Sequence, residues 1–347
     1  MSIRVIKPGL LTSVQDLGRY GYQKHGVIVS GAMDPFAHRI ANLLVGNQES
    51  EATLEMTLLG PTLQFEADAL IAICGADLSP SVGSIPLPLW KPILVKKGET
   101  VRFGGCRNGT RAYLAVAGGF PLPKVMGSRS TYLRAGLGGF NGRSLLTGDE
   151  LPIGIPSEQG RLLIGQLQSQ RGEGAFSAAE WGAAPELMPA YRAQPVIRAM
   201  RGNQFEWFSP ESREAFFTRP FRVTPQSDRM GYRLEGPTLN LAEKKELISE
   251  AVAFGSVQVP AEGNPIVLLA DRQTTGGYPK IAQIATVDLP VIAQTKPGDT
   301  LRFEEISREE AEYLYVEREN HIRQLKLGIM LKQRIGGRSH VPSGFEL

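Results

Sequence analysis

Two polar clusters in the second half of the chain contain the residue types that acid–base and anion-stabilising chemistry requires. Residues 227–233 read SerAspArgMetGlyTyrArg, and in residues 270–280 an apolar run ends on an Asp-Arg-Gln-Thr-Thr-Gly-Gly-Tyr-Pro-Lys segment. A carboxylate can exchange protons with a nitrogen, and cationic side chains can stabilise negative charge that develops on oxygen. The candidate catalytic residues are therefore Asp271, Arg229, Lys280 and Asp228.

The loop that follows Asp271 carries most of the candidate substrate-binding residues. Its hydroxyl and amide side chains can donate hydrogen bonds, and its two glycines permit a close backbone approach to a ligand. The expected set is Gln273, Thr274, Thr275, Gly276, Gly277 and Tyr278 from this loop, with Tyr232 and Ser30 from elsewhere.

Alternatives to these functional interpretations stay open. Asp77 ends a similar apolar run in the first half of the chain, so Asp271 could simply cap a turn. The segment SerGlyAlaMetAspPro at 30–35 could bind an anion at a helix start, but capping of that helix by Asp34 explains it equally well. The segment GlnAspLeuGlyArgTyrGlyTyrGln at 15–23 is either functional or a strand-turn-strand corner with an Asp16–Arg19 pair.

Several common chemistries have no support in the sequence. The four histidines and two cysteines lack the spacing of a metal site, and there is no nucleophilic serine elbow. The glycine-rich run at 136–144 lacks the spacing and the lysine of a nucleotide-binding loop, which favours a tight turn segment. No Met-Lys-Met attachment site for biotin is present. We expect no bound metal in this chain.

Composition and charge exclude further classes of protein. Hydrophobic residues make up 42% and charged residues 21% of the 347 residues, which is typical of a globular chain of about two domains. The net charge of +3 comes without a basic run, so we expect no nucleic-acid partner. The chain has no apolar run of about 18 residues and no apolar leader at its start, so we expect neither membrane nor export. Two cysteines cannot form a disulfide framework, which favours free thiols in the reducing cytoplasm.

Four matched landmarks in the same order predict an internal repeat. Residues 97–103 return as 297–303, both with a Gly-acid-Thr turn before an alternating strand. The other matches join 70–77 with 266–271, Glu55 and Gly60 with Glu250 and Gly255, and the GlyTyr pairs at 21–22 and 231–232. The loop at 273–279 falls in extra length of the second copy, which favours a function for it.

The remaining pattern predicts a mainly β protein with few helices. Short apolar runs at 69–74, 112–117 and 265–270 indicate buried strands, and helices are expected over 35–45, 210–217 and about 307–327. We expect a first domain over 1–167 with a helical insertion, a linker over 168–195, and a second domain over 196–306. A C-terminal helix over 307–334 and a loose tail over 335–347 complete the chain.

The motifs taken together resemble the family of KipA and the 5-oxoprolinase C subunit. SerValGlnAspLeuGlyArgTyrGlyTyrGln, SerGlyAlaMetAsp, LeuGluMetThrLeuLeuGlyPro, GlySerArgSerThr, SerAspArgMetGlyTyrArgLeu and GlnThrThrGlyGlyTyrPro carry the resemblance over residues 13–279. The family is also described as biotin-dependent carboxyltransferase or allophanate hydrolase subunit 2-like. It is similar to the carboxyltransferase domain of urea carboxylase and urea amidolyase. The resemblance implies two cyclophilin-like β-barrel domains, in agreement with the repeat.

The same resemblance implies a function in a complex. It implies a component that hydrolyses 5-oxo-L-proline to L-glutamate with ATP, together with a KipI-like B subunit and a 5-oxoprolinase A subunit, and that is inactive alone. The ATP site would then lie in the complex at an unknown place. One alternative is a biotin-dependent carboxyltransferase that acts on urea or amide substrates, and another is a KipA-type regulator that binds a KipI-like kinase inhibitor.

Overall fold

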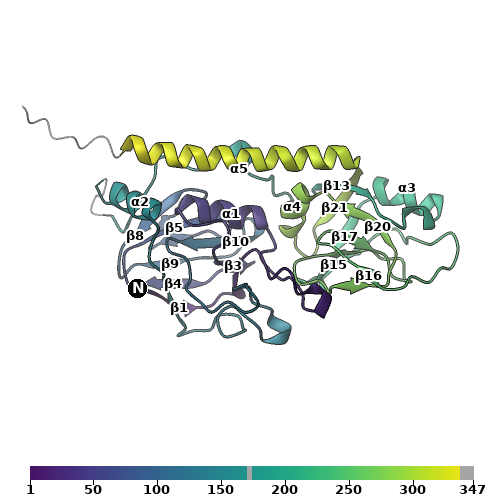
Figure 1. Ribbon diagram of the computed structural model, residues 1–347, viewed down its shortest axis with the longest axis horizontal. Coiled ribbons are helices and arrows are strands. Elements are labelled where there is room, and N and C mark those ends of the chain that lie inside the picture. Colours follow the sequence, from purple (N-terminus) through teal and green to yellow (C-terminus); the bar gives the residue numbers. More distant parts are fainter. Residues whose placement is uncertain (170–173, 337–347) are drawn as a thin grey trace, which may run out of the picture.

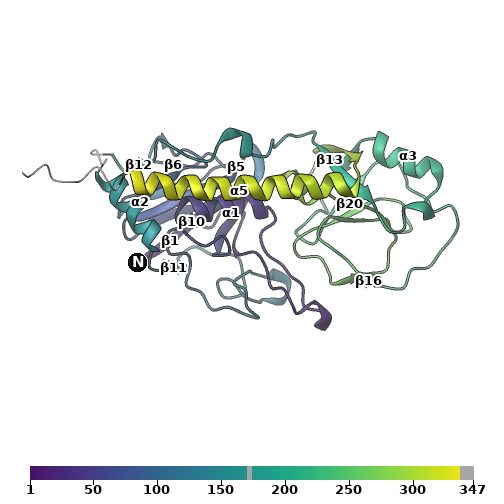
Figure 2. The ribbon, with the colours of Figure 1, turned by 45° about the horizontal axis from the view of Figure 1, so that its top comes forward.

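The computed structural model describes residues 1–169 and 174–336 and has two lobes that lie side by side (Figure 1). Residues up to about 187 build one lobe, and residues 196–306 build the other. The long helix α5 (Arg308–Gly336) then runs along the outside of both lobes, as both views show (Figures 1 and 2).

The first lobe consists of two six-stranded sheets that enclose one apolar core. One sheet has the spatial order β11 (Glu150–Pro152), β1 (Ser2–Lys7), β4 (Thr62–Phe65), β9 (Thr100–Arg102), β6 (Ser81–Val82), β7 (Ile85–Pro86). The other has the order β12 (Phe176–Ala178), β8 (Pro92–Val95), β5 (Ala69–Asp77), β10 (Asn108–Val116), β3 (Thr53–Thr57), β2 (Leu11–Gln15).

The apolar run of β5 reflects burial on both of its faces. Because side chains alternate along a strand, Ile71 and Ile73 enter the core between the sheets. Leu70 and Cys74 point to the opposite side, where helices cover the sheet. A strand that is covered on both sides has no polar face, which explains why apolar and polar residues do not alternate in this segment.

The second lobe is a closed barrel of seven strands. Its order is β13 (Val196–Arg201), β20 (Lys280–Ile284), β17 (Ser256–Gln258), β18 (Ile266–Leu268), β15 (Gly231–Glu235), β14 (Phe221–Val223), β21 (Thr300–Glu305). β16 (Glu250–Ala251) and β19 (Thr275–Gly276) form a separate two-stranded sheet. The mainly β class is confirmed, but only this lobe closes as a barrel. In the first lobe the two sheets share a core without a continuous ladder.

The helices follow local sequence signals. Besides α5 they are α1 (Pro35–Leu44), α2 (Glu158–Ser169), α3 (Pro210–Thr218) and α4 (Leu289–Ala293), with short 3-10 turns η1 (Gln23–His25), η2 (Leu133–Ala135), η3 (Pro185–Leu187), η4 (Phe205–Trp207) and η5 (Thr286–Asp288). The expected helices at α1 and α3 are confirmed. Asp34 caps α1, as one of the two open interpretations held, and Ser209 caps α3. Within the described residues, no helix has the length and apolarity to cross a bilayer.

Helix α5 joins the lobes through its inner face. Near its start Ala311 packs on the second lobe, and further along Ile322 and Ile329 pack on the helices of the first lobe. Arg39 of α1 donates to both carboxylate oxygens of Glu319 at 2.6 and 2.8 Å. The expected helix therefore forms, and it continues beyond residue 327.

The expected linker, tail and internal repeat have different outcomes in the structure. Within the expected linker 168–195, β12 pairs with β8 and so belongs to the first lobe. The expected tail lies outside the described residues from 337 onward. The repeat stays a prediction. Both Gly-acid-Thr segments do precede strands, but Glu55 lies in a six-stranded sheet and Glu250 in the two-stranded one.

Candidate functional site

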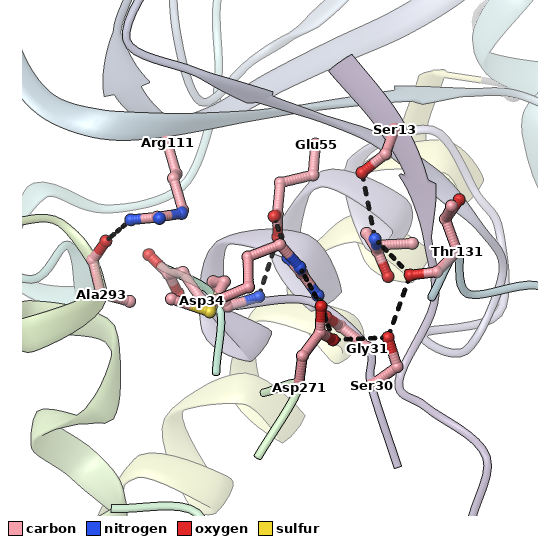
Figure 3. A network of polar contacts seen from close by, with 12 residues as sticks. Ser13, Ser30, Gly31, Asp34, Glu55, Arg111, Thr131, Asp271 and Ala293 are labelled. Atoms are coloured by element: carbon pink, nitrogen blue, oxygen red, sulfur yellow. Dashed lines mark hydrogen bonds and ion pairs between the residues drawn. The ribbon is translucent and has the colours of Figure 1, made fainter. Parts of the chain in front are cut away.

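Arg229 is buried at the contact between the lobes and donates hydrogen bonds to Glu55, Asp271 and Gly31, which Figure 3 labels in a network of polar groups. Its Nε donates to Asp271 Oδ2 at 2.9 Å, and its Nη2 donates to Asp271 Oδ1 at 3.1 Å. Its Nη1 donates to Glu55 of the first lobe, and Nη2 also donates to the carbonyl oxygen of Gly31. One guanidinium thus neutralises two buried carboxylates, and burial of these carboxylates without a counter-charge would strongly destabilise the folded protein.

Glu55 is held ionised by its surroundings. Met33 N and the Tyr113 hydroxyl each donate to Glu55 Oε2 at 2.8 Å. Burial by itself raises the pKa of Glu55, but the charges of Arg229 and Arg111 with these hydrogen bonds outweigh it and lower that pKa below its ordinary value. Burial also raises the pKa of Tyr113, which therefore keeps its proton and can donate a hydrogen bond to Glu55.

The segment SerGlyAlaMetAsp at 30–34, which belongs to the first lobe, contacts the second lobe at several points. The Ser30 hydroxyl contacts Asp271 Oδ1 at 2.7 Å and the Thr131 carbonyl oxygen at 3.0 Å. Met33 is buried among the core side chains of the second lobe. Gly31 has a φ of +99°, and a Cβ there would meet the backbone of residues 17 and 18. These residues of the motif therefore have structural tasks at this contact.

A second group of contacts extends the network toward α4 (Figure 3). Gln294 Nε2 donates to Asp34 Oδ2 at 3.0 Å, and its Oε1 accepts from Arg111 N at 2.8 Å. Arg111 Nη1 contacts the Tyr232 hydroxyl and the Ala293 carbonyl oxygen. Tyr232, an expected binding residue, is thus buried in this lobe contact and engaged there. Burial raises the pKa of Asp34, against its hydrogen bonds to Ala37, Gln294 and Tyr191.

A cavity of about 350 Å³ opens beside the network. Its lining includes Arg272, which directly follows Asp271, and Asp228, which directly precedes Arg229. Arg134 of the first lobe completes one wall and pairs with Asp228 Oδ2 at 3.0 Å. Gln273 and Tyr278 of the expected binding loop also line the cavity.

The cavity carries an excess of positive charge. Arg134, Arg233 and Arg272 line it, and Asp228 is the acidic residue among its lining side chains. Burial lowers the pKa of Arg272, whose guanidinium contacts carbonyl oxygens at 3.3 and 3.5 Å and the face of Phe254. Within the described residues no carboxylate pairs with Arg272. A carboxylate or another small anion in the cavity would supply that partner.

The structure separates Lys280 from Asp271 and Arg229. Lys280 Nζ pairs with Glu250, and Gln204 Nε2 donates to the same Glu250 oxygen at 3.0 Å. β19, which contains Thr275 and Gly276, pairs with β16 beside this group.

The rest of the expected binding loop contacts other segments of the second lobe. The Thr274 carbonyl oxygen accepts from Val252 N at 3.2 Å. Gly277 and Tyr278 line a second, larger cavity of about 800 Å³. Only Gln273 and Tyr278 of the loop therefore reach the cavity that Asp228 lines.

Asp16 and Arg19 do not form the pair that one of the two interpretations of residues 15–23 required. Asp16 accepts from Ser128 Oγ at 2.7 Å, Ser130 Oγ at 2.5 Å and Arg129 N at 2.6 Å, so it binds the GlySerArgSerThr segment. Arg19 is buried, and its Nη2 donates to the Ser130 carbonyl oxygen at 2.6 Å. Burial lowers the pKa of Arg19. Its Nε and Nη1 have no hydrogen-bond partner among the residues that the structure describes.

Residues 1–169 and 174–332 contain no group of three His, Cys, Asp or Glu side chains placed to hold a metal ion. The side chains that meet at the lobe contact are guanidinium, carboxylate and hydroxyl groups.

The family model of the carboxyltransferase domain, subdomain A and B, matches residues 25–305, which cover most of both lobes and include Glu55, Arg229 and Asp271 of the network. The chain belongs to the carboxyltransferase domain family. It is 38% identical over 323 residues to the 5-oxoprolinase C subunit of Escherichia coli, covering 93% of this chain and 97% of that protein. It is 37% identical over 314 residues to the 5-oxoprolinase C subunit of Haemophilus influenzae, covering 90% and 94%.

A solved structure gives the carboxyltransferase domain family the same fold. The crystal structure of urea carboxylase from Kluyveromyces lactis superposes with a TM-score of 0.83 at 31% identity. The match covers 92% of this chain and 29% of that one. The resemblance found from the motifs is thereby confirmed at the level of the family.

Sequence reasoning missed several residues of the site. Glu55 was noticed only as a repeat landmark, and Arg111, Tyr113, Gln294 and Arg272 were not singled out. A signal was present for two of them, because Glu55 lies between Leu54 and Met56 in a buried strand and Arg111 directly precedes the apolar run from Ala112 to Val116. A charged residue within a buried strand requires a polar or charged partner. For Glu55 and Arg111 such a partner comes from the other lobe, so the residues around them in the sequence do not indicate which group supplies it.

Proposed function

We propose that this chain is the C subunit of an ATP-dependent 5-oxoprolinase. In this proposal it hydrolyses 5-oxo-L-proline to L-glutamate together with a KipI-like B subunit and an A subunit, and it is inactive alone. The observation that carries the proposal is the 38% identity to a 5-oxoprolinase C subunit that extends over 97% of that relative. Similarity over a whole subunit supports a shared role more strongly than similarity over one motif.

The cavity beside the network supports a small anionic substrate. 5-Oxo-L-proline carries one carboxylate and one lactam, and the volume of about 350 Å³ suits a small molecule. Arg272, which has no carboxylate partner among the described residues, would bind the substrate carboxylate. Arg233, in the lining of the same cavity, adds to the positive potential that attracts an anion.

Burial and exposure divide the two aspartates into different roles, because Asp271 is buried and Asp228 is exposed. Both oxygens of Asp271 are occupied by Arg229 and Ser30, so Asp271 acts as a positioning residue that holds Ser30 in place. Asp228 lines the cavity, and its carboxylate is exposed, although Oδ1 accepts from Met230 N at 2.8 Å and Oδ2 from Arg134 at 3.0 Å. Because of this exposure Asp228 is the better placed base for transfer of a proton. Lys280 would act outside this site, through Glu250.

Activation by ATP is assigned to the complex. A lactam is stabilised by amide resonance, so water adds to its carbonyl carbon slowly until the carbonyl oxygen is activated. The sequence has no phosphate-binding loop, so the proposal places nucleotide binding in, or shared with, the partner subunits.

The proposal is tested by measuring glutamate formed from 5-oxo-L-proline and ATP. The chain is assayed alone, with the B subunit, and with the A and B subunits together. Glutamate should form only with the full set, and Asp271→Asn should abolish its formation while co-purification with the partners persists. Absence of glutamate from the full complex would overturn the proposal. Loss of partner binding by Asp271→Asn would instead favour a regulatory role of the KipA type.

Family membership favours one second candidate, a biotin-dependent carboxyltransferase that acts on urea or amides. In that case the carboxyl group would arrive on biotin carried by another protein, since this chain has no attachment lysine motif. The cationic cavity would then bind the transferred carboxylate. Turnover of free carboxybiotin with urea by the isolated chain would support this candidate. Its absence with all amide acceptors tried would count against it.

A further inference from the structure

The outer face of α5 exposes large apolar side chains that the fold does not use. Tyr313 is 66% exposed, Val316 55%, Leu327 58% and Leu331 58%. The opposite face of the same helix carries Ala311, Ile322 and Ile329, which are buried against the lobes. In Figure 2 no other element covers α5 on its outer side. The helix therefore has one apolar face for the fold and a second one without a partner among the described residues.

These exposed residues form one narrow stripe. With Asn320 and Gln324 between them, successive members are three or four residues apart, which keeps them on one side of a helix. From Tyr313 to Leu331 the stripe is about 27 Å long at 1.5 Å per residue. An apolar stripe of this kind is typical of a helix that pairs with another helix.

The stripe is nearly symmetric about the level of Ile322 on the helix. Tyr313 and Leu331 lie equally far from that level in the sequence, and so do Asn320 and Gln324. Val316 and Leu327 do so within one residue. In an antiparallel pair of identical helices, apolar side chains would face apolar ones and amides would face amides. A two-fold axis at this level therefore gives a self-complementary contact, as in common protein dimers.

The exposed charges of α5 also favour an antiparallel pair of helices. The first half of α5 exposes Glu309, Glu310, Glu312 and Glu317 beside a single exposed cation, Arg308, which pairs with Glu312, and the second half exposes Arg323, Lys326 and Lys332. An antiparallel partner would bring the acidic half against the basic half, whereas a parallel partner would bring like charges together. The antiparallel orientation also aligns the helix dipoles favourably.

We infer that α5 is the dimer interface of this protein and that its occupant is a second copy of the same chain, paired antiparallel about the level of Ile322. This inference does not depend on the proposed enzymatic function. The stripe lies on the outside of both lobes, and none of its residues lines the cavity that contains Arg272, so dimerisation leaves that cavity accessible.

Sedimentation equilibrium of the full chain tests the inference. The wild-type chain should be dimeric at tens of micromolar, and Val316→Glu or Leu327→Lys should each make it monomeric at the same concentration. Ile155→Glu is the matched control, because Ile155 is exposed but lies outside the stripe, in a different segment of the chain. Thermal unfolding of each variant should stay near that of the wild type, since the substituted side chains are exposed.

A charge-pair rescue tests the orientation. In the antiparallel register the carboxylate introduced at position 316 faces the ammonium group introduced at position 327 of the other copy. The double variant Val316→Glu with Leu327→Lys should therefore be dimeric again, and an equimolar mixture of the two single variants should form heterodimers. Positions 316 and 327 are about 16 Å apart along one helix, so the pair cannot form within one chain.

Three results would overturn the inference, and they are distinct. A wild-type chain that is monomeric at tens of micromolar would contradict self-association, including the case in which the stripe serves a different protein. Dimers that survive both single substitutions would place the interface elsewhere. Failure of the double variant to dimerise, with both single variants monomeric, would exclude the antiparallel register.

Discussion

Arg229 of the second lobe and Glu55 of the first lobe form a buried ion pair across the contact between the lobes. Arg229 lies in the connection between β14 and β15, and Glu55 lies within β3. Asp271 holds the other edge of the same guanidinium. The position of the two lobes relative to each other therefore depends on one cation shared by two carboxylates from different lobes.

Replacement of Arg229 should destabilise the protein strongly. Arg229→Met leaves Glu55 and Asp271 buried without a counter-charge, which should lower the free energy of unfolding by about 3–5 kcal/mol. Urea denaturation followed by tryptophan fluorescence measures this change. Arg222→Met is the control, because Arg222 and Glu235 form an exposed pair, and its loss should cost about 1 kcal/mol or less.

The coupling between Arg229 and Glu55 can be isolated. Adding Glu55→Gln to Arg229→Met removes one of the uncompensated charges, so the double variant should be more stable than the sum of the single effects predicts. Because the residues touch, we expect a coupling of roughly 1–3 kcal/mol in a double-mutant cycle. Additive effects would show that the two side chains do not interact in solution.

His38 should make stability depend on pH in mildly acidic solution. Burial lowers the pKa of His38 to about 4, from 6.5 in the unfolded chain. As the pH falls from about 6.5 to about 4, the unfolded chain binds a proton that the folded protein excludes, so the free energy of unfolding falls. At about 1.4 kcal/mol per pH unit, the loss amounts to roughly 3 kcal/mol.

The measurement compares unfolding free energies at several pH values between about 7 and about 4.5, the range in which the unfolded chain takes up this proton. His38→Gln should flatten the slope, whatever its effect on stability in neutral solution. His25→Gln should keep the wild-type slope, because His25 is exposed. An unchanged slope in His38→Gln would assign the pH dependence to other groups.

Arg272 should matter for ligand binding more than for stability. Its guanidinium pairs with no carboxylate among the described residues, so Arg272→Gln breaks no ion pair there and should change the free energy of unfolding by about 1 kcal/mol or less. In the assembled enzyme it should raise KM for 5-oxo-L-proline by roughly tenfold or more, as expected for the loss of a charged hydrogen bond. Arg107→Gln, on the exposed surface, is the control; equal KM values for the two variants would contradict the assignment.

Lys280 and Asp271 should differ in their effect on turnover. Lys280→Met breaks the pair with Glu250 away from the lobe contact, so turnover of the assembled complex should stay within a few-fold of wild type. Asp271→Asn weakens the hold on Arg229 and Ser30 together and should lower turnover by roughly 100-fold or more, as expected when positioning of a site is lost. A loss in Lys280→Met as large as that in Asp271→Asn would return Lys280 to the catalytic set.

Signals between residues close together in the chain were sufficient to predict the local elements. Asp34 before Pro35 marks the start of α1, the two Gly-acid-Thr turns precede strands, and the apolar runs form the buried strands β5, β10 and β18. These signals are local, because a cap, a turn or a strand depends on residues within a few positions of one another. The motifs were sufficient to identify the family as well.

Which residues share the site depends on how distant segments pack in the folded protein. Ser30, Asp271 and Arg229 come from three distant segments and meet, whereas Lys280, only nine positions after Asp271, faces Glu250 instead. Glu55 enters the network through the packing of one lobe on the other. The pairing of buried charges is a long-range property: a buried carboxylate requires a counter-charge, but its sequence neighbourhood does not say which segment supplies it.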